Sequence, residues 1–318
     1  MSPRIPEDSR YHPLSAHYRR RFGCRVYKVS VSVAQTCPNR TSPVMSVCVF
    51  CDEWGSAAYP EHARRSLAEQ IRINGDHMRR RFKADKLLVY FQAYTNTFTR
   101  QRELEAMVET ALAQPDVAGI ILGTRPDCLP PRVWRLLDAV SRDAYVSVEL
   151  GVQTLDDAQL RFLSRGHDAA SSLRALERLG AHERIEGCAH LMFGIPGETP
   201  QQLRETARTL SALGVNGVKL HNLHVLRGTP LADMHAAGEF TPVTLDAYAD
   251  KVITFLEHLD PAVPVHRLNA VASRWDEVVA PAWACKKMEP TMAIIQRMAE
   301  RDTWQGRLVS PRPARRVG

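Results

Sequence analysis

Long apolar runs are missing from this sequence. Its 318 residues contain no stretch of about 18 apolar residues, the length at which a helix becomes a candidate to cross a bilayer. The first 15 residues also lack the apolar region of a secretory signal. We therefore expect a cytoplasmic protein without a membrane partner. The hydrophobic composition of 44% is enough to bury the core of one large domain or two ordinary ones.

A disulfide framework is missing as well. The seven cysteines are an odd number, and four of them are scattered singly, at Cys24, Cys128, Cys188 and Cys285. The other three form a cluster, Cys37, Cys48 and Cys51. This pattern favours metal-binding or catalytic thiols in a reducing compartment. All the scattered cysteines except the first are expected to be core or incidental thiols, because none has a partner at ligand spacing.

The net charge of +7 is moderate but unevenly distributed. Basic residues gather at Arg19–Arg21, at Arg79–Arg81 followed by Lys83 and Lys86, and in the segment 312–316. Such clusters are either solvated helix faces and tails, which is the commoner case, or a footprint for a polyanion. Taken alone, they do not indicate a nucleic-acid-binding protein.

Short β-rich runs alternate with helical patterns from about residue 26. The predicted strands are 26–33, 87–94, 119–122, 145–150, 188–193 and 217–223. The predicted helices are 67–82, 103–113, 132–139, 171–179, 199–213 and 244–259. Consecutive β-α units imply a parallel sheet with right-handed crossovers, and hence an α/β fold that is either a doubly wound sheet or a barrel.

The alternation weakens after about residue 225. Residues 260–290 contain four prolines and resemble an irregular cover, which one helix and a basic tail follow. We therefore expect an N-terminal extension over 1–25, a core over 26–225, and a C-terminal irregular and helical cover with a basic tail over 226–318.

Polar or glycine-rich segments follow every predicted strand. In both candidate folds ligands gather at the carboxyl ends of the strands, so these segments should converge on one face. The three-cysteine loop follows the first strand, and the others are Gln92–Thr97, Gly123–Asp127, Glu149–Thr154, Gly194–Thr199 and Lys219–His224.

The three clustered cysteines lack a fourth ligand. A closed zinc site needs a second pair of ligands, and the nearest candidates, His62 and His77, are single and lie in helix-like stretches. Three thiolates suit a 4Fe–4S cluster with one open iron, with zinc as the alternative. Phe50, just before the last cysteine, would limit the access of water to such a cluster.

At this point the sequence resembles a known family. A three-cysteine loop after the first strand of six β-α units, with an aromatic residue before the last cysteine, is similar to the radical S-adenosylmethionine superfamily. More narrowly, TCPNR, YFQAYTNT, GTRPDCL, ELGVQT, GIPGET and KLHNLHVLRGT resemble a bacterial family related to the elongator catalytic subunit, over about residues 18–285.

The resemblance implies a partial (β/α)6 TIM-like barrel. It also implies a 4Fe–4S cluster on Cys37, Cys48 and Cys51 whose open iron chelates S-adenosylmethionine. Reductive cleavage of this cofactor would release methionine and a 5'-deoxyadenosyl radical that abstracts hydrogen from the substrate. An external electron donor of the flavodoxin or ferredoxin type would be needed.

The resemblance also implies roles for residues at the other strand ends. The cofactor's amino group would be contacted after the second strand, at Tyr94, Thr95 and Asn96. Glu149 and Gln153 share one face of the fourth strand and could bind the ribose or amino group, unless Glu149 is a salt-bridged carboxylate. Gly194 and Gly197 would let the backbone approach the cofactor, unless they form a plain turn.

The remaining candidates concern the substrate. Lys219 and His221 share one face of the last strand, and Asn222 and His224 share the other. The pair that points inward is a candidate for holding the substrate, with Lys219 and His221 preferred, although a structural histidine fits equally well. Within Arg125–Asp127, the two charged residues either pair with each other or cap the next helix.

The family resemblance implies a tRNA substrate. The elongator-like class acts on the wobble uridine, and the narrower family is associated with converting 5-carboxymethylaminomethyl-(2-thio)uridine to the 5-aminomethyl form. Basic clusters near Arg20 and Arg80 would suit tRNA phosphates. The alternatives are a radical enzyme acting on a small metabolite or protein, and a non-catalytic metal-binding module.

Overall fold

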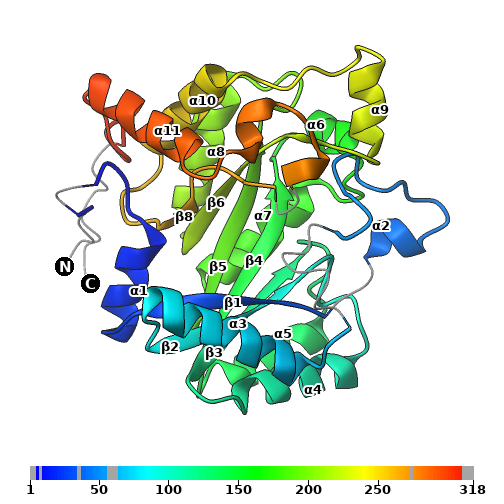
Figure 1. Ribbon diagram of the computed structural model, residues 1–318, viewed down its shortest axis with the longest axis vertical. Helices are drawn as coiled ribbons and strands as arrows, with labels where there is room; N and C mark the ends of the chain where they lie inside the picture. Colours follow the sequence, from blue (N-terminus) through cyan, green and yellow to red (C-terminus); the bar gives the residue numbers. More distant parts are fainter. Residues whose placement is uncertain (1–4, 7–8, 34–36, 56–63, 273–274, 310–318) are drawn as a thin grey trace, which may run out of the picture.

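A curled parallel sheet forms the centre of the molecule. The computed structural model describes residues 5–6, 9–33, 37–55, 64–272 and 275–309. Seven parallel strands follow in the order β1-β2-β3-β4-β5-β6-β8 and curl into a half-barrel with helices on the outside (Figure 1). The α/β class and the partial TIM-like barrel are thereby confirmed. The strands are β1 Val26–Ser32, β2 Lys86–Gln92, β3 Val117–Thr124, β4 Tyr145–Gln153, β5 Ile185–Phe193, β6 Gly217–Asn222 and β8 Val265–Arg267.

The seventh strand corrects the sequence prediction. Residues Val265–Arg267 fall in the segment predicted to be irregular, yet they pair in parallel with β6. The strand has three residues and follows a proline, and two of its side chains, His266 and Arg267, are polar. Neither an apolar run nor an alternation long enough to predict a strand is present.

The helices predicted after the strands are all present. They are α3 Leu67–Phe82, α4 Gln101–Leu112, α5 Pro131–Val140, α7 Ala169–Gly180, α8 Pro200–Ala212 and α10 Leu245–Glu257. The described residues form further short elements, which are α1 Leu14–Phe22, α2 Pro38–Thr41, α6 Asp157–Phe162, α9 Pro230–Ala236, η2 Trp275–Glu277, η3 Ala282–Cys285 and the predicted final helix, α11 Glu289–Glu300. A small antiparallel sheet pairs β7 Val225–Leu226 with β9 Val278–Ala280. In the described part of the chain, no helix has both the length and the apolar character needed to cross a membrane.

Local sequence explains where the helices begin. The Thr199 hydroxyl accepts a hydrogen bond from the backbone amide of Gln202, and the Gln202 Oε1 accepts one from the backbone amide of Thr199, which closes a capping box. Pro200 occupies the first turn, where its missing N–H costs nothing. Helix α8 therefore begins immediately after the GIPGET segment and fixes its position.

Strand β1 alternates between an apolar outer face and a polar inner face. On β1, Val29 and Val31 are buried in the main core beneath the helices, whereas Lys28 and Ser30 line the inside of the half-barrel. Strands of most parallel sheets are apolar on both faces, because both are covered. The polar residues on the inner face of β1 therefore indicate a cavity at this level of the half-barrel, whereas Leu88 and Ile121 pack with Tyr18 of α1 in a separate apolar cluster.

Segments from the two ends of the chain meet at the open edge of the sheet. The amide of Val265 on β8 donates to the carbonyl of His12 at 2.7 Å, and Pro13 bridges to the same strand. The side chain of Gln305 accepts from the amide of His12 at 2.9 Å and donates to the carbonyl of Val263 at 2.8 Å. The edge strand is thus covered by residues from both ends.

Candidate active site

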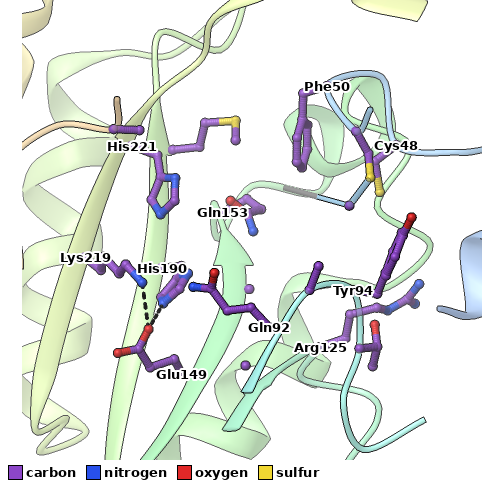
Figure 2. A pocket seen from close by; sticks show the side chains of 18 of the residues that line it. Cys48, Phe50, Gln92, Tyr94, Arg125, Glu149, Gln153, His190, Lys219 and His221 are labelled. Carbon is purple, nitrogen blue, oxygen red and sulfur yellow. Dashed lines mark hydrogen bonds and ion pairs between the residues drawn. The ribbon is translucent and has the colours of Figure 1, made fainter. Parts of the chain in front are cut away.

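A cavity of about 480 Å³ lies at the carboxyl ends of the strands, as expected for this fold. The three clustered cysteines line one side of it. Figure 2 shows Cys48, Phe50 and Tyr94 on this side, and Glu149, His190, Lys219 and His221 across the cavity from them. Segments far apart in the sequence are therefore brought together around one cavity.

The cysteine loop is folded by one helical turn and one asparagine. Cys37 precedes α2, and Pro38 occupies the first helical position. The Asn39 amide donates to the carbonyl of Ser46 at 3.0 Å, to that of Ser164 at 2.6 Å and to the Cys48 Sγ at 3.4 Å. Because this side chain ties the two ends of the loop together, the glycine-free segment 41–47 still returns the chain toward the second cysteine.

Two arginines lie against the cysteine sulfurs. Arg165 approaches the Cys48 Sγ at 3.3 Å, and Arg40 approaches the Cys51 Sγ at 3.6 Å. Burial raises the pKa of Cys51 to about 11, while the hydrogen bond from Arg40 acts in the opposite direction. Positive donors next to the sulfurs stabilise thiolates and the negative charge of a metal-sulfur centre.

The residues present fit a 4Fe–4S cluster with a bound cofactor. The three thiols are free of disulfides and share one cavity wall. Asn96 also faces the cavity, and its Oδ1 is buried without a hydrogen-bond partner among the described residues. An unpaired acceptor of this kind suits an amino group such as that of S-adenosylmethionine. Of the zinc ligands considered, His77 lies on α3 and does not line the cavity, and His62 is outside the described residues.

Tyr94 holds the loop in place. Its hydroxyl donates to the carbonyl of Glu53, and the Arg40 guanidinium lies 5.2 Å from the ring centroid. Gly55 packs against the ring so closely that a Cβ there would lie 2.3 Å from a ring carbon. Thr95, next in sequence, is buried at the cavity wall.

Arg125 pairs with Asp127 at 2.7 Å, which decides between the two alternatives for this segment. It also donates to the Oδ1 of Asn39 and, at 3.0 Å, to the carbonyl of Gly166. The Arg125–Asp127 pair therefore supports the cysteine loop through the contact between Arg125 and Asn39. The sequence did not indicate this role, because the partners come from three separate segments.

Glu149 is fully buried inside the half-barrel and is surrounded by four bases. One carboxylate oxygen accepts from Lys28 and lies 3.2 Å from His266, and the other lies 2.8 Å from Lys219 and 2.7 Å from His190. Burial by itself would raise the pKa of Glu149, but Lys219 and Lys28 outweigh it and hold the pKa well below the ordinary range. Glu149 is thus an ionised carboxylate at the centre of an ion-pair network.

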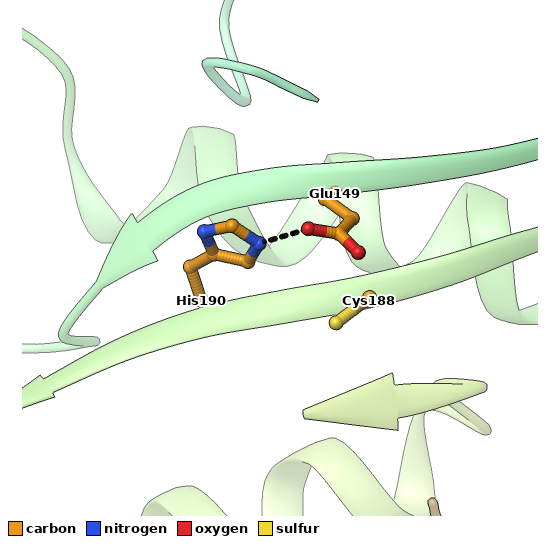
Figure 3. Close-up of side chains that lie close together, drawn as sticks. All are labelled: Glu149, Cys188 and His190. Carbon is orange, nitrogen blue, oxygen red and sulfur yellow. Dashed lines mark hydrogen bonds and ion pairs between the residues drawn. The ribbon is translucent and has the colours of Figure 1, made fainter. Parts of the chain in front are cut away.

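Glu149, Cys188 and His190 are close enough together to suggest a metal site. Figure 3 shows them on the adjacent strands β4 and β5, and their ligand atoms lie within 4.8 Å of one another. However, the carboxylate is already paired with two ammonium groups, and burial raises the pKa of Cys188 well above its ordinary value. A site that combines a neutral thiol with two adjacent cations does not suit a metal ion.

Lys219 and His221 both face the cavity, and so do Asn222 and His224. Burial lowers the pKa of Lys219 to about 8, against the opposing effect of Glu149. Burial also lowers the pKa of His221 well below its ordinary value, and Arg267 adds to this effect. His221 is therefore a neutral ring at physiological pH, and it lies beside a guanidinium group.

The two glycines of GIPGET do not line the cavity. Gly194 and Gly197 have φ values of 91° and 77°, which are strained for other residues. The amide of Gly194 donates to Glu198 at 3.0 Å, and Glu198 pairs with Lys251 at 2.9 Å. In this structure they form the turn from β5 into α8. Gln153, by contrast, faces the cavity, as do Glu149 and the glycine between them.

Several residues of the site were missed from the sequence. They are Lys28, Asn39, Arg40, Tyr90, Arg165, His190, His266 and Arg267. A signal existed for Lys28, since it alternates with valines in a predicted strand. None existed for the last two, because their strand was not predicted.

Comparisons with known proteins agree with this geometry. The family model of the radical SAM superfamily matches residues 31–210, and that of the radical SAM C-terminal domain matches residues 215–300. The protein YtqA of Bacillus subtilis (strain 168) is 34% identical over 301 residues, which cover 94% of this chain and 93% of YtqA.

Two further proteins are similar over parts of their length. The tRNA uridine(34) acetyltransferase of Dehalococcoides mccartyi (strain CBDB1) is 31% identical over 145 residues, which cover 43% of this chain and 30% of that enzyme. The structure of Methanocaldococcus infernus Elp3 with an N-terminal deletion matches with a TM-score of 0.68 at 17% identity, over 89% of this chain and 64% of that chain. This chain therefore spans just under two thirds of the Elp3 chain, with which it shares a fold.

The resemblance stated from the sequence motifs is confirmed by the superfamily match and the full-length similarity to YtqA. The two predicted cofactors, a 4Fe–4S cluster and S-adenosylmethionine, are those of this family. The chain belongs to the radical S-adenosylmethionine superfamily.

Proposed function

We propose that this radical S-adenosylmethionine enzyme modifies the wobble uridine of tRNA, converting 5-carboxymethylaminomethyl-(2-thio)uridine to the 5-aminomethyl form. The observation that carries the proposal is the partial similarity to a tRNA uridine(34) acetyltransferase. Residue 34 of tRNA is the wobble position, so the proposal places this chain on the same nucleotide.

The chain's own residues have distinct tasks in this proposal. When bound at Cys37, Cys48 and Cys51, the cluster and S-adenosylmethionine supply one-electron chemistry that removes a hydrogen atom from the substrate. Arg40 and Arg165 stabilise the sulfur ligands, and Phe50 shields this side of the cavity from water. Asn96, Gln153 and the neighbouring strand ends would orient the cofactor, and Lys219 and His221 would face the substrate.

The dimensions of the cavity suit one extruded nucleotide. Its volume of about 480 Å³ is that of a small-molecule site, and a folded RNA could reach the interior only with a base turned out of its stack. Phe98, which follows β2 in the sequence, is 40% exposed. Together with Arg100 and Arg132 it lines a second hollow on the surface. An exposed aromatic ring flanked by arginines suits stacking and phosphate contacts with single-stranded RNA.

The two basic clusters noted in the sequence lie away from the cavity. Arg19–Arg21 end α1 directly before β1, and Arg79–Arg81 end α3 directly before β2. They therefore lie at the amino ends of the strands, and Figure 1 shows α1 and the loop helix α2 at opposite ends of β1. We therefore assign the expected contacts with tRNA phosphates near the site to the surface beside Phe98 instead. The third cluster, 312–316, is outside the described residues.

Nucleoside analysis of tRNA tests the proposal. A strain lacking the gene should accumulate 5-carboxymethylaminomethyl-(2-thio)uridine and lose the 5-aminomethyl form and its derivatives. Wild-type protein and Cys285→Ala should restore the profile, and Cys48→Ala should not, because only the latter removes a cluster ligand. Iron and sulfide analysis of the two purified variants controls for folding and cluster content.

An unchanged wobble-uridine profile would refute the tRNA substrate and leave the radical chemistry intact. The small-metabolite alternative would then be favoured, and salt-sensitive binding of tRNA should also be absent. Cleavage of S-adenosylmethionine by Cys48→Ala protein would contradict the assignment of the cluster itself.

A further inference from the structure

Arg267 lies on the cavity wall across from the cysteines, and it has no anionic partner among the residues that the structure describes. It lies on β8, and its Nη2 lies 2.7 and 2.8 Å from the two ring nitrogens of His221. Its Nε is buried and makes no hydrogen bond with any described residue. Within the described ranges, no carboxylate forms an ion pair with this guanidinium. Arg267 is half-buried at the cavity wall, where a charge without a counter-ion is costly to the extent that it is removed from water.

The surroundings of Arg267 have an excess of positive charge. Lys28 and Lys219 both pair with Glu149, so this one carboxylate already serves two cations and Arg267 adds a third positive charge. His190 adds no charge to this region, because burial lowers its pKa to about 3 and the ring is neutral. Neighbouring positive charges in a cavity repel one another, and a bound anion relieves this repulsion.

We propose that Arg267, together with His221 and Lys219, forms a subsite for a carboxylate group of the substrate. The proposal rests on the proposed function to the extent that the substrate is a modified uridine, whose side arm ends in a carboxylate. The subsite itself is argued from the unpaired guanidinium and the excess positive charge.

A carboxylate fits this subsite better than a phosphodiester does. The guanidinium fork matches the two oxygens of a carboxylate, and the free Nε supplies one of the two donors needed. A phosphodiester in RNA continues as a chain on both sides and needs an open groove. Lys219 is only 8% exposed at this wall, so a terminal group can enter where a continuous backbone cannot.

The carboxylate of the cofactor is served by the other side of the cavity. By the family resemblance, an open iron held by the three cysteines would take up the carboxylate of S-adenosylmethionine. Figure 2 shows His221 and Lys219 across the cavity from Cys48. Arg165 already lies 3.3 Å from the Cys48 sulfur and can serve the cofactor there. The unpaired guanidinium on β8 is therefore left for the substrate.

Three matched probes test the subsite on the anaerobically reconstituted holoenzyme with S-adenosylmethionine present. N-benzylglycine carries an aromatic ring, an aminomethyl arm and a carboxylate, N-benzylglycinamide replaces the charge by a neutral amide, and (benzylamino)methylphosphonate carries a phosphonate. Calorimetric titration should show the acid binding about tenfold or more tightly than the amide, as expected for a charge-assisted pair. The phosphonate should bind more weakly than the acid.

Variants assign this preference to one residue. Arg267→Met should abolish the difference between acid and amide, and Arg267→Lys should retain part of it, because the charge remains but the fork is lost. Arg227→Met is the matched control, since this arginine is exposed and does not line the cavity. Apoprotein carrying Arg267→Met should unfold at the same or a higher temperature than wild type, because it no longer buries an unpaired charge. A structural role for Arg267 would instead lower that temperature.

Four results would overturn the subsite. They are equal or undetectable binding of acid and amide to wild type, a preference that survives in Arg267→Met, tighter binding of the phosphonate than of the acid, and displacement of the acid by S-adenosylmethionine. The last two would assign the guanidinium to a phosphate or to the cofactor. A carboxylate preference combined with an unchanged tRNA nucleoside profile would keep the subsite and refute the tRNA substrate, so the two proposals fail separately.

Discussion

Replacing Glu149 with glutamine tests the electrostatics of the half-barrel most directly. The change keeps the shape of the side chain and removes the charge that Lys28 and Lys219 share. Glu149 is 1% exposed, so water cannot take over its role. Breaking a buried ion pair by removing one partner costs about 3–5 kcal/mol, because the other charge remains buried without compensation. Two lysines depend on this carboxylate, so we expect a loss at the upper end of that range.

Urea unfolding of the apoprotein at pH 7 measures this loss as a change in the free energy of unfolding. Glu69→Gln is the matched control, because Glu69 pairs with Arg65 at 2.8 Å while both side chains are more than 40% exposed. Such exposed pairs contribute about 0–1 kcal/mol. If Glu149→Gln costs no more than Glu69→Gln, the lysines are compensated by another group and the account of the network is wrong. The double variant Glu149→Gln with Lys219→Met should recover part of the loss.

Two further predictions concern the cavity rim and acid stability. Gly55→Ala should destabilise the protein by more than Gly238→Ala and lower its iron content, since both glycines have a left-handed φ but only Gly55 packs against the Tyr94 ring; equal stability and equal iron would refute the contact. Burial lowers the pKa of His224 to about 4. As the pH falls from about 6.5 to 4, this histidine is therefore protonated in the unfolded chain but not in the folded protein. The free energy of unfolding should then fall by up to about 1.4 kcal/mol per pH unit because of this group. His224→Gln should reduce that slope in unfolding curves measured at pH 4 to 7, and an unchanged slope would contradict the assignment.

Most strands could be predicted because the side chains on their outer faces are buried in the core, and these positions are therefore apolar in the sequence. Val29 and Val31 on β1, for instance, produce an alternation that ordinary strand patterns detect. Strand β8 gave no such signal, since its outward residue Val265 stands alone beside His266 and Arg267. The strand exists because β6 offers an unpaired edge, which is a property of the assembled sheet.

The site divides in the same way. The position of Cys37, Cys48 and Cys51 on one wall of the cavity could be predicted, because their spacing along the chain limits their separation in space. The partners of Glu149 could not, since Lys28 and His266 are 238 positions apart and meet only through the curl of the sheet. Gly194 and Gly197 were predicted to approach the cofactor, but they form the turn from β5 into α8. The sequence could not separate these two roles, because a glycine-rich segment after a strand serves either one.

The covering of β8 by both ends of the chain has a consequence for folding. The hydrogen bond between His12 and Gln305 joins residues 293 positions apart, and Val265 must be in place before the amino-terminal segment can pair with it. Contacts of such long range close late, because the entropy of a large loop is lost before they form. During synthesis the amino-terminal segment emerges from the ribosome first and waits for nearly the whole chain. Arg267 lies on the same edge strand, so the geometry at this wall of the cavity depends on a strand that both ends of the chain hold in place.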